Sequence, residues 1–152
     1  MGKDYVGGMT DITNTSTDTR SVVERYVAAV EAGDGATIRD LFAGTATWRL
    51  FGDMPMSGTW RGRDAIIDEF LAGALGHYEP GSIRLEITAV VADGERAVVE
   101  WTSRARTRRG EPYENFCVGV FTVRDGKIQA VREYMDTAYA TRMLFGGDRA
   151  AA

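Results

Sequence analysis

From Ile83 onward the chain alternates apolar and polar residues with a period of two, which is typical of β-strands with one buried face. Two Asp-Gly pairs, at residues 93–94 and 125–126, separate alternating segments, and this dipeptide favours the tight turn of a β-hairpin. A further turn is expected near residues 109–110. The second half of the chain therefore predicts an antiparallel sheet. Its later strands are expected over Glu95–Thr107, Pro112–Val123 and Ile128–Asp136.

The first half of the chain has helical periodicity instead. A first helix is capped by Thr19 or Ser21 and ended by Gly33, and a third ends at Gly76. Between the short second helix and the third, Thr45–Phe51 predicts a strand, followed by a loop that leads through residue 60. The apolar positions are Val22, Val23, Tyr26, Val27 and Val30 in the first helix, Ile38, Leu41 and Phe42 in the second, and Ile66, Ile67, Phe70, Leu71 and Leu75 in the third.

Helices followed by an antiparallel meander define the α+β class. A strongly twisted sheet with helices on its concave side makes a cone-shaped α+β barrel, here with three N-terminal helices packed on the sheet. The interior of such a cone is a natural pocket for a small molecule. We expect a disordered N-terminal arm over residues 1–18, a single domain over residues 19–147 and a flexible tail over residues 148–152. The segment around Phe145 is expected to pack as a final turn or to lie in an oligomer interface.

Composition narrows the function classes. The chain has 152 residues, 44% of them hydrophobic and 26% charged, as in an ordinary globular domain. A net charge of −4 and a pI near 5.1 argue against nucleic acid or an anionic membrane as the main partner. The opening stretch lacks the apolar segment of a secretory signal. The single cysteine permits no internal disulfide, which fits a reducing, cytoplasmic location.

Several catalytic motifs are absent from the sequence. One His and one Cys cannot form a structural zinc site, so we expect no metal. The chain contains no P-loop, no dinucleotide-binding fingerprint and no Gly-x-Ser-x-Gly elbow, so no cofactor is expected. Cofactor-free acid–base chemistry and simple binding remain.

The predicted last strand carries an acid on an apolar face. Alternation places Val131, Glu133 and Met135 on the same side, and the two apolar neighbours favour burial. A carboxylate there is costly unless it is paired, and it often titrates abnormally. Glu133 is therefore our candidate acid–base residue. The alternative is a structural ion pair with Arg104 or Arg106 inside the cone.

The order of elements and several segments resemble the SnoaL-like and ketosteroid isomerase-like branch of the nuclear-transport-factor-two-like superfamily. The opening helix with Asp40-Leu-Phe42 is similar to the start of ketosteroid isomerase, and Ser57–Ile66 is similar to the loop and third helix of SnoaL-like proteins. Residues 119–121, 125–128 and 132–136 resemble the final hairpin of that branch. The resemblance covers residues 19–145 and implies the fold more specifically than the reaction.

Only some of the catalytic residues of ketosteroid isomerase have a counterpart at the matching positions of this sequence. Tyr26 matches the helix-one tyrosine that donates a hydrogen bond to the developing enolate, although a core aromatic role is the alternative. The aspartate base falls on Leu50, and the second, protonated aspartate falls near Gly119. Because two of three groups are missing, steroid isomerisation by that route is not expected.

Limonene epoxide hydrolase offers a second comparison. Glu133 matches its final-strand aspartate and Arg104 matches its arginine, while its remaining aspartate falls on Arg106. The pair that holds the water falls on Trp48 and Leu50, which counts against hydrolysis. SnoaL-type polyketide cyclases use one acid in the late sheet for an aldol closure, and Glu133 is the candidate for that role. This alignment implies that the arginines face inward; the alternative is an outer, solvated position.

The leading interpretation is a cofactor-free cyclase or isomerase of a hydrophobic, oxygen-bearing small molecule, such as a polyketide-type intermediate in antibiotic biosynthesis. Glu133 moves the proton, Arg104 orients or stabilises an oxyanion, and Tyr26 donates a hydrogen bond. Cys117 lacks an activating base, and His77 is expected at the surface at a helix end. The expected substrate-binding residues are Trp48, Leu50, Met56, Trp60, Arg106, Asn115, Cys117, Gly119, Phe121 and Met135.

Other interpretations stay open. The cone could promote a pericyclic closure through shape alone, with no role for the acid. A non-catalytic small-molecule binding protein is a second class, and a dehydratase or epoxide hydrolase-like enzyme is a third. The resemblance also implies a homodimer formed through the convex face of the sheet.

Overall fold

The computed structural model describes residues 7–146, with side chains described from Asn14 onward. The helical elements are α1 (Gly7–Ala32), α2 (Gly35–Leu41), the π-helical segment η1 (Ala65–Leu71) with its continuation α3 (Ala72–Leu75), and α4 (Thr137–Phe145). The strands are β1 (Phe42–Leu50), β2 (Gly58–Arg61), β3 (Arg84–Asp93), β4 (Arg96–Arg106), β5 (Pro112–Arg124) and β6 (Lys127–Met135).

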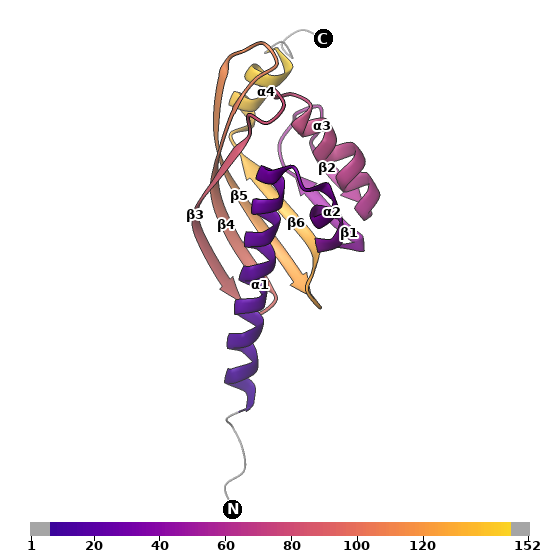
Figure 1. Ribbon diagram of the computed structural model, residues 1–152, viewed down its shortest axis with the longest axis vertical. Helices are drawn as coiled ribbons and strands as arrows, with labels where there is room; N and C mark the ends of the chain where they lie inside the picture. The colour runs from indigo at the N-terminus through magenta and orange to yellow at the C-terminus, as the bar shows by residue number, and fades with distance from the viewer. Residues whose placement is uncertain (1–6, 147–152) are drawn as a thin grey trace, which may run out of the picture.

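These elements form the expected α+β fold, in which helices pack on a strongly curved sheet (Figure 1). The six strands lie in the order β2-β1-β6-β5-β4-β3. Neighbouring strands are antiparallel except for β1 and β6, which are parallel. In Figure 1, α1 runs across the sheet, and α4 lies near the end of the long strands opposite the start of α1. The predicted cone-shaped α+β barrel is confirmed.

Both predicted hairpin turns are confirmed, although the loop of the first consists of Gly94 and Glu95, with Asp93 as the last residue of β3. One joins β3 to β4, where Gly94 has a φ of +55°, and the other joins β5 to β6. In the second turn, Asp125 and Gly126 both have positive φ, at 52° and 70°, which is the geometry of a tight hairpin turn. The second turn pairs Arg124 with Lys127, and a register shift between Thr122 and Val123 then places Gly119 of β5 opposite Glu133 of β6.

The sequence predicted β1 only in part and did not predict β2. β1 begins at Phe42 rather than Thr45, and Gly58–Arg61 forms a strand where a loop was expected. β2 pairs with the outer edge of β1, as between Trp48 and Trp60, and satisfies backbone groups that would otherwise lack partners.

The segment after β6 folds as a helix. The side chain of Asp136 caps α4 by accepting a hydrogen bond from the backbone N–H of Tyr139 at 3.0 Å. Gly146 ends the helix in the left-handed conformation, with a φ of 82°. Of the two outcomes expected for this segment, packing as a final helical turn is the one observed.

The expectation of a disordered arm over residues 1–18 is wrong in its described part, because α1 begins at Gly7. Ser16 and Thr19 fix this part of the helix to the β3–β4 turn. The Ser16 hydroxyl accepts a hydrogen bond from the Gly94 N–H, and the Thr19 hydroxyl donates to the Gly94 carbonyl at 2.7 Å. Thr19 is therefore a buried contact inside the helix and not its cap. Residues 1–6 and the expected flexible tail, 148–152, lie outside the described residues.

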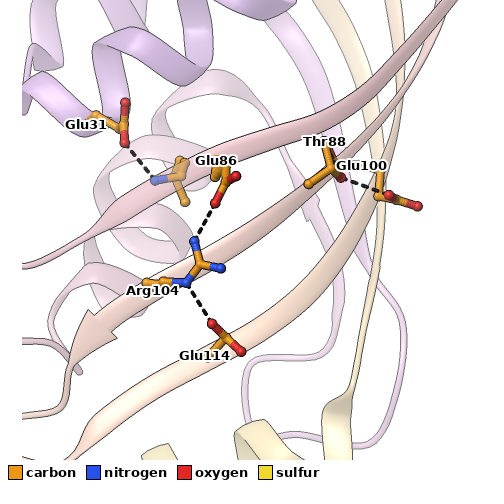
Figure 2. A network of polar contacts seen from close by, with 7 residues as sticks. Glu31, Glu86, Thr88, Glu100, Arg104 and Glu114 are labelled. Atoms are coloured by element: carbon orange, nitrogen blue, oxygen red, sulfur yellow. Dashed lines mark hydrogen bonds and ion pairs between the residues drawn. The ribbon is translucent and has the colours of Figure 1, made fainter.

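The core lies between the concave face of the sheet and α1. Tyr26 of α1 packs its ring against those of Phe42, Trp48 and Phe121, with centroid distances of 5.6, 6.1 and 5.9 Å. At the end of α1, the Glu31 carboxylate accepts a hydrogen bond from the Leu85 N–H at 2.7 Å, which ties the helix to the edge strand β3 (Figure 2). The helix therefore covers the sheet without filling the whole interior of the cone.

Candidate functional site

An apolar chamber of about 120 Å³ remains between the sheet and the helices. For comparison, a dry apolar cavity of ~150 Å³ takes one benzene molecule. The enclosed part of a ligand is therefore about the size of one six-membered ring. Its aromatic lining residues are Tyr26, Trp48, Phe70, Tyr78, Trp101, Tyr113 and Phe121. The rest of the lining consists of Val27, Val30, Leu50, Met54, Met56, Leu71, Ala74, Leu75, Ile83, Leu85, Ser103, Cys117, Glu133, Met135, Ala140 and Leu144.

Glu133 is the carboxylic acid of this chamber. The register places it between Leu50 of β1 and Gly119 of β5, and only 7% of the residue is exposed. The indole Nε1 of Trp48 donates a hydrogen bond to its Oε2 at 2.9 Å. Burial raises the pKa of Glu133 from 4.5 to about 7, although the Trp48 hydrogen bond acts in the opposite direction. Near neutral pH the group is therefore present in both protonation states, which suits general acid–base work.

No cationic side chain belongs to the chamber lining within the described residues. A ligand that carries a carboxylate or phosphate would therefore find no counter-charge there and would face the Glu133 acid. The lining favours an uncharged, hydrophobic ligand with hydrogen-bonding atoms.

The remaining polar groups of the chamber are weak acids. Burial, followed by the charge of Glu133, raises the pKa of Tyr26 and raises that of Cys117 to about 12. The Cys117 thiol therefore stays protonated and is a poor nucleophile. Ser103 lies beside Cys117 inside the protein. Its hydroxyl accepts a hydrogen bond from the Trp101 indole at 3.0 Å and lies 3.8 Å from the Cys117 sulfur.

Most of the expected site residues line the same chamber. The chamber lining includes both Glu133 and Tyr26 of the expected catalytic set. It also includes six of the expected substrate-binding residues: Trp48, Leu50, Met56, Cys117, Phe121 and Met135. The structure thus places these side chains together, and their roles stay predictions.

The expected inward placement of Arg104 and Arg106 is wrong. Figure 2 shows Arg104 between two acids of neighbouring strands, where it forms ion pairs with Glu86 of β3 at 2.5 Å and with Glu114 of β5 at 2.6 Å. Arg106 is also exposed, 3.8 Å from the Glu79 carboxylate. Alternation decides the face: Ala97, Val99, Trp101 and Ser103 of the same strand are buried, so the even-numbered arginines point outward.

Three further expected binding residues do not line the chamber. Asn115 is buried, but its amide binds the Tyr113 hydroxyl and the backbone of Asp136. Gly119 lies behind the ring of Phe121, so it shapes the lining without forming it. The indole N–H of Trp60 donates to the Met56 carbonyl at 3.1 Å, outside the lining.

The lining residues that sequence reasoning missed include four with polar side-chain atoms: Tyr78, Trp101, Ser103 and Tyr113. Trp101 and Ser103 follow from the correct face of β4, because both lie at odd-numbered positions, whereas the arginines that were expected to face inward lie at even-numbered ones. Tyr113 lies on the same face of β5 as Asn115 and Cys117, so alternation could have found it. Tyr78 follows α3 outside any regular strand, and no periodic signal marks it.

His77, which was expected at the surface, is half-buried after α3 and lies outside the chamber lining. Its ring packs edge-on against Phe145 with a centroid distance of 4.6 Å. Burial, together with the charge of Arg108, lowers its pKa. Within residues 7–146, no group of three or more His, Cys, Asp or Glu side chains is arranged to hold a metal ion. No helix among these residues is both long and apolar enough to cross a membrane.

Comparison with known proteins gives a family match. Residues 23–131 match a family model described as a SnoaL-like domain. Two curated relatives, each named ECF RNA polymerase sigma factor SigG and found in two strains of Mycobacterium tuberculosis, are 26% identical over 122 residues. The match covers 80% of this chain and only 30% of each relative, so the chain spans less than a third of their length.

Solved structures share the whole architecture. Bal32a, from a soil-derived mobile gene cassette, is 25% identical with a TM-score of 0.76, and the match covers 86% of this chain and 98% of Bal32a. An NTF2-like protein from Burkholderia pseudomallei K96243 is 23% identical with a TM-score of 0.74, covering 84% and 97% of the two chains. TerC, co-crystallised with polyporic acid, is 23% identical with a TM-score of 0.74, covering 85% and 99%. The similarity to the Burkholderia protein and to TerC, at 23% identity each, shows a shared fold and no more.

Proposed function

Because this chain belongs to the SnoaL-like domain family, we propose that it is a cofactor-free enzyme that cyclises or isomerises a small, hydrophobic, oxygen-bearing molecule. Glu133 is the proton carrier of this reaction. Its carboxylic acid gives a proton to a substrate oxygen, or its carboxylate takes one from a carbon next to a carbonyl group. A polyketide-type intermediate of antibiotic biosynthesis is the substrate we favour.

The position and pKa of Glu133 carry this proposal. The acid lies in an apolar chamber, receives one hydrogen bond from Trp48 and has a pKa of about 7. A buried carboxyl group without a cationic partner is costly to the fold, and such costs are typical of functional sites. Arg104 and Arg106 have no part in the mechanism, because both are exposed on the outer face. Hydroxyl and indole groups therefore supply the polar contacts to the substrate.

The shape of the chamber supports the substrate class. Aromatic and aliphatic side chains surround a space about the size of one ring, which suits a neutral cyclic or cyclising molecule. A larger substrate would extend through the open side of the chamber. The co-crystallisation of TerC with polyporic acid is in keeping with a small-molecule ligand in this fold.

A non-catalytic ligand-binding domain is the second candidate. The match to sigma factors, of which this chain spans 30%, favours it. A sigma factor acts in transcription, so a domain of this kind within such a protein would bind a ligand rather than convert a substrate. Glu133 would then be a recognition group for a hydrogen-bonding ligand.

We also propose a cytoplasmic homodimer that forms through the outer face of the sheet. Four large apolar side chains are exposed there, on strands β3 to β6: Val91, Val98, Phe116 and Tyr134. Phe116 is 66% exposed, which is costly for a phenylalanine in water. A second copy of the chain would remove these residues from water.

The test begins with the small molecules that co-purify with the protein, identified by mass spectrometry. The enzyme hypothesis predicts that the wild-type protein converts such a molecule, and that Glu133→Gln slows the conversion by about 10²–10⁴-fold. Glu100→Gln, on the outer face of β4, is the matched control and should keep the wild-type rate. Recovery of the bound molecule unchanged would favour the binding protein, and near-normal turnover by Glu133→Gln would exclude Glu133 as the proton carrier.

A further inference from the structure

Two tyrosine hydroxyls lie in the wall of the chamber, and the proposed function does not yet use them. Tyr78 follows α3, where a β-bridge to Thr107 fixes its backbone, and Tyr113 lies at the start of β5. Their rings lie 5.2 Å apart at an angle of 54°, and both residues line the chamber. Tyr113 is only 4% exposed, so its hydroxyl must find its hydrogen-bond partners inside the protein or in a ligand.

The oxygen of Tyr113 is held by a fixed donor. Asn115 donates one hydrogen bond from Nδ2 to the Tyr113 hydroxyl at 3.0 Å and another to the Asp136 carbonyl at 3.0 Å. Its Oδ1 accepts a hydrogen bond from the Asp136 N–H at 3.2 Å. Because every polar group of this amide is engaged, the amide cannot rotate to accept the proton of Tyr113. The Tyr113 proton must therefore point away from Asn115.

The hydroxyl protons of Tyr78 and Tyr113 outnumber the acceptors that the two residues have within the described part of the chain. The hydroxyls of Tyr78 and Tyr113 carry two protons between them and can share only one hydrogen bond with each other. Neither hydroxyl donates a hydrogen bond to any other described residue. At least one hydroxyl proton is therefore available to an acceptor atom inside the chamber.

This proton belongs to a strong and neutral donor. Burial raises the pKa of both tyrosines, so neither ionises near neutral pH. Asn115 donates to the Tyr113 oxygen, and a hydroxyl whose oxygen accepts a hydrogen bond donates its own proton more strongly. Tyr78, Tyr113 and Glu133 all line the same chamber, so the tyrosine pair and the acid face the same space.

We propose that Tyr113 donates its proton to the carbonyl oxygen of the substrate, and that Tyr78 is a positioning residue that holds the Tyr113 oxygen in place. This inference rests on the proposed function and narrows its substrate to an uncharged, ring-bearing ketone. The Tyr113 hydroxyl takes the place of the oxyanion partner that Arg104 was expected to provide. Glu133 remains the group that moves the proton, since Tyr113 only donates a hydrogen bond.

Acetophenone is a probe of matching size, and cumene is its counterpart without the oxygen. NMR titrations give the affinity of the protein for each probe. A substitution that only changes the shape of the chamber should alter both affinities alike, so their ratio reports on the hydrogen bond to the ketone oxygen. In Tyr113→Phe, the acetophenone-to-cumene affinity ratio should fall by about 5–10-fold, as for the loss of one hydrogen bond. The carbonyl infrared band of bound acetophenone should lie at a lower frequency in the wild-type protein than in Tyr113→Phe.

Further variants separate a donor role from a structural one. Tyr78→Phe should shift the carbonyl band part of the way toward that of Tyr113→Phe. Tyr139→Phe is the matched control: its ring lies 5.3 Å from that of Tyr113, but its hydroxyl accepts from the Glu114 N–H outside the lining. This variant should keep the wild-type band and ratio. Retained binding of cumene by Tyr113→Phe shows that the chamber is intact.

The outcomes distinguish this inference from the proposed function. If acetophenone binds and its carbonyl band is the same in the wild-type protein and in Tyr113→Phe, Tyr113 is not the donor, and the role of Glu133 is unaffected. If neither acetophenone nor cumene binds, the chamber does not take ring-sized ligands, and both proposals are overturned.

Discussion

Trp48 and Glu133 form a hydrogen bond of 2.9 Å between two parallel strands inside the chamber. The bond opposes the main effect on the acid, because burial raises the pKa of Glu133 and the indole N–H lowers it. Burial is the larger effect, and the pKa of about 7 is the result. Trp48 therefore limits how far the pKa of the acid rises, in addition to shaping the chamber wall.

The first prediction concerns this pair. Trp48→Phe removes the donor and keeps an aromatic ring, so the pKa of Glu133 should rise above that in the wild-type protein. A carboxyl ¹³C NMR titration of both proteins measures the change. Trp60→Phe is the control, since the indole of Trp60 donates to the Met56 carbonyl and not to the acid. An unchanged or lower pKa in Trp48→Phe would contradict the assigned effect of the hydrogen bond.

The second prediction concerns stability. The pKa of Glu133 is about 7 in the folded protein and near 4.5 when exposed. Between these values the folded state holds a proton that the unfolded state has lost, so the free energy of unfolding falls as pH rises. The full contribution is present below pH 4.5, is lost as pH rises through 7, and amounts to about 3 kcal/mol.

Urea unfolding of the wild-type protein and Glu133→Gln at pH 4 and pH 8 measures this contribution. The variant cannot titrate at this position, and other ionisable groups cancel in the comparison. Relative to the wild-type protein, Glu133→Gln should gain stability on going from pH 4 to pH 8. A difference that does not change with pH would mean that the acid titrates normally.

The third prediction concerns the packing behind the chamber wall. A Cβ atom at Gly119 would lie 2.7 Å from the Phe121 ring and 3.0 Å from the Trp101 ring. Gly119→Ala should therefore push these rings toward the chamber and lower the free energy of unfolding by about 1–3 kcal/mol. Gly44→Ala is the control, because a Cβ there meets nothing within 4 Å. Equal stability of both variants would show that the rings yield without cost.

The fourth prediction concerns the proposed dimer. Phe116→Glu places a charge on the exposed apolar patch of the outer face and should shift the protein from dimer to monomer. Sedimentation velocity over a range of concentrations measures the change. Ala28→Glu, on an exposed position of α1, should leave the dimer intact. A wild-type protein that is monomeric at all concentrations would refute the dimer directly.

Much of the fold could be predicted from periodicity and turn residues. The Asp-Gly turns and the alternation in β3 to β6 determined the hairpins, because these signals are local in sequence. The parallel pairing of β1 with β6 and the addition of β2 could not be predicted in this way. Both depend on contacts between segments that are far apart in the chain.

The candidate site was predicted with one systematic error. The last strand gave the correct face for Glu133, because Val131 and Met135 flank it. In β4, the alignment placed Arg104 inside, although Trp101 and Ser103 occupy that face. A shift of one residue exchanges the two faces of a strand, and the apolar neighbours were the better guide.

The titration of Glu133 in the wild-type protein is the most direct test of this account. A carboxyl ¹³C NMR titration should show a midpoint near pH 7 for Glu133. A Glu133 midpoint near pH 4.5 would mean that the acid is ionised at neutral pH, and the account of a proton carrier held by burial would be wrong.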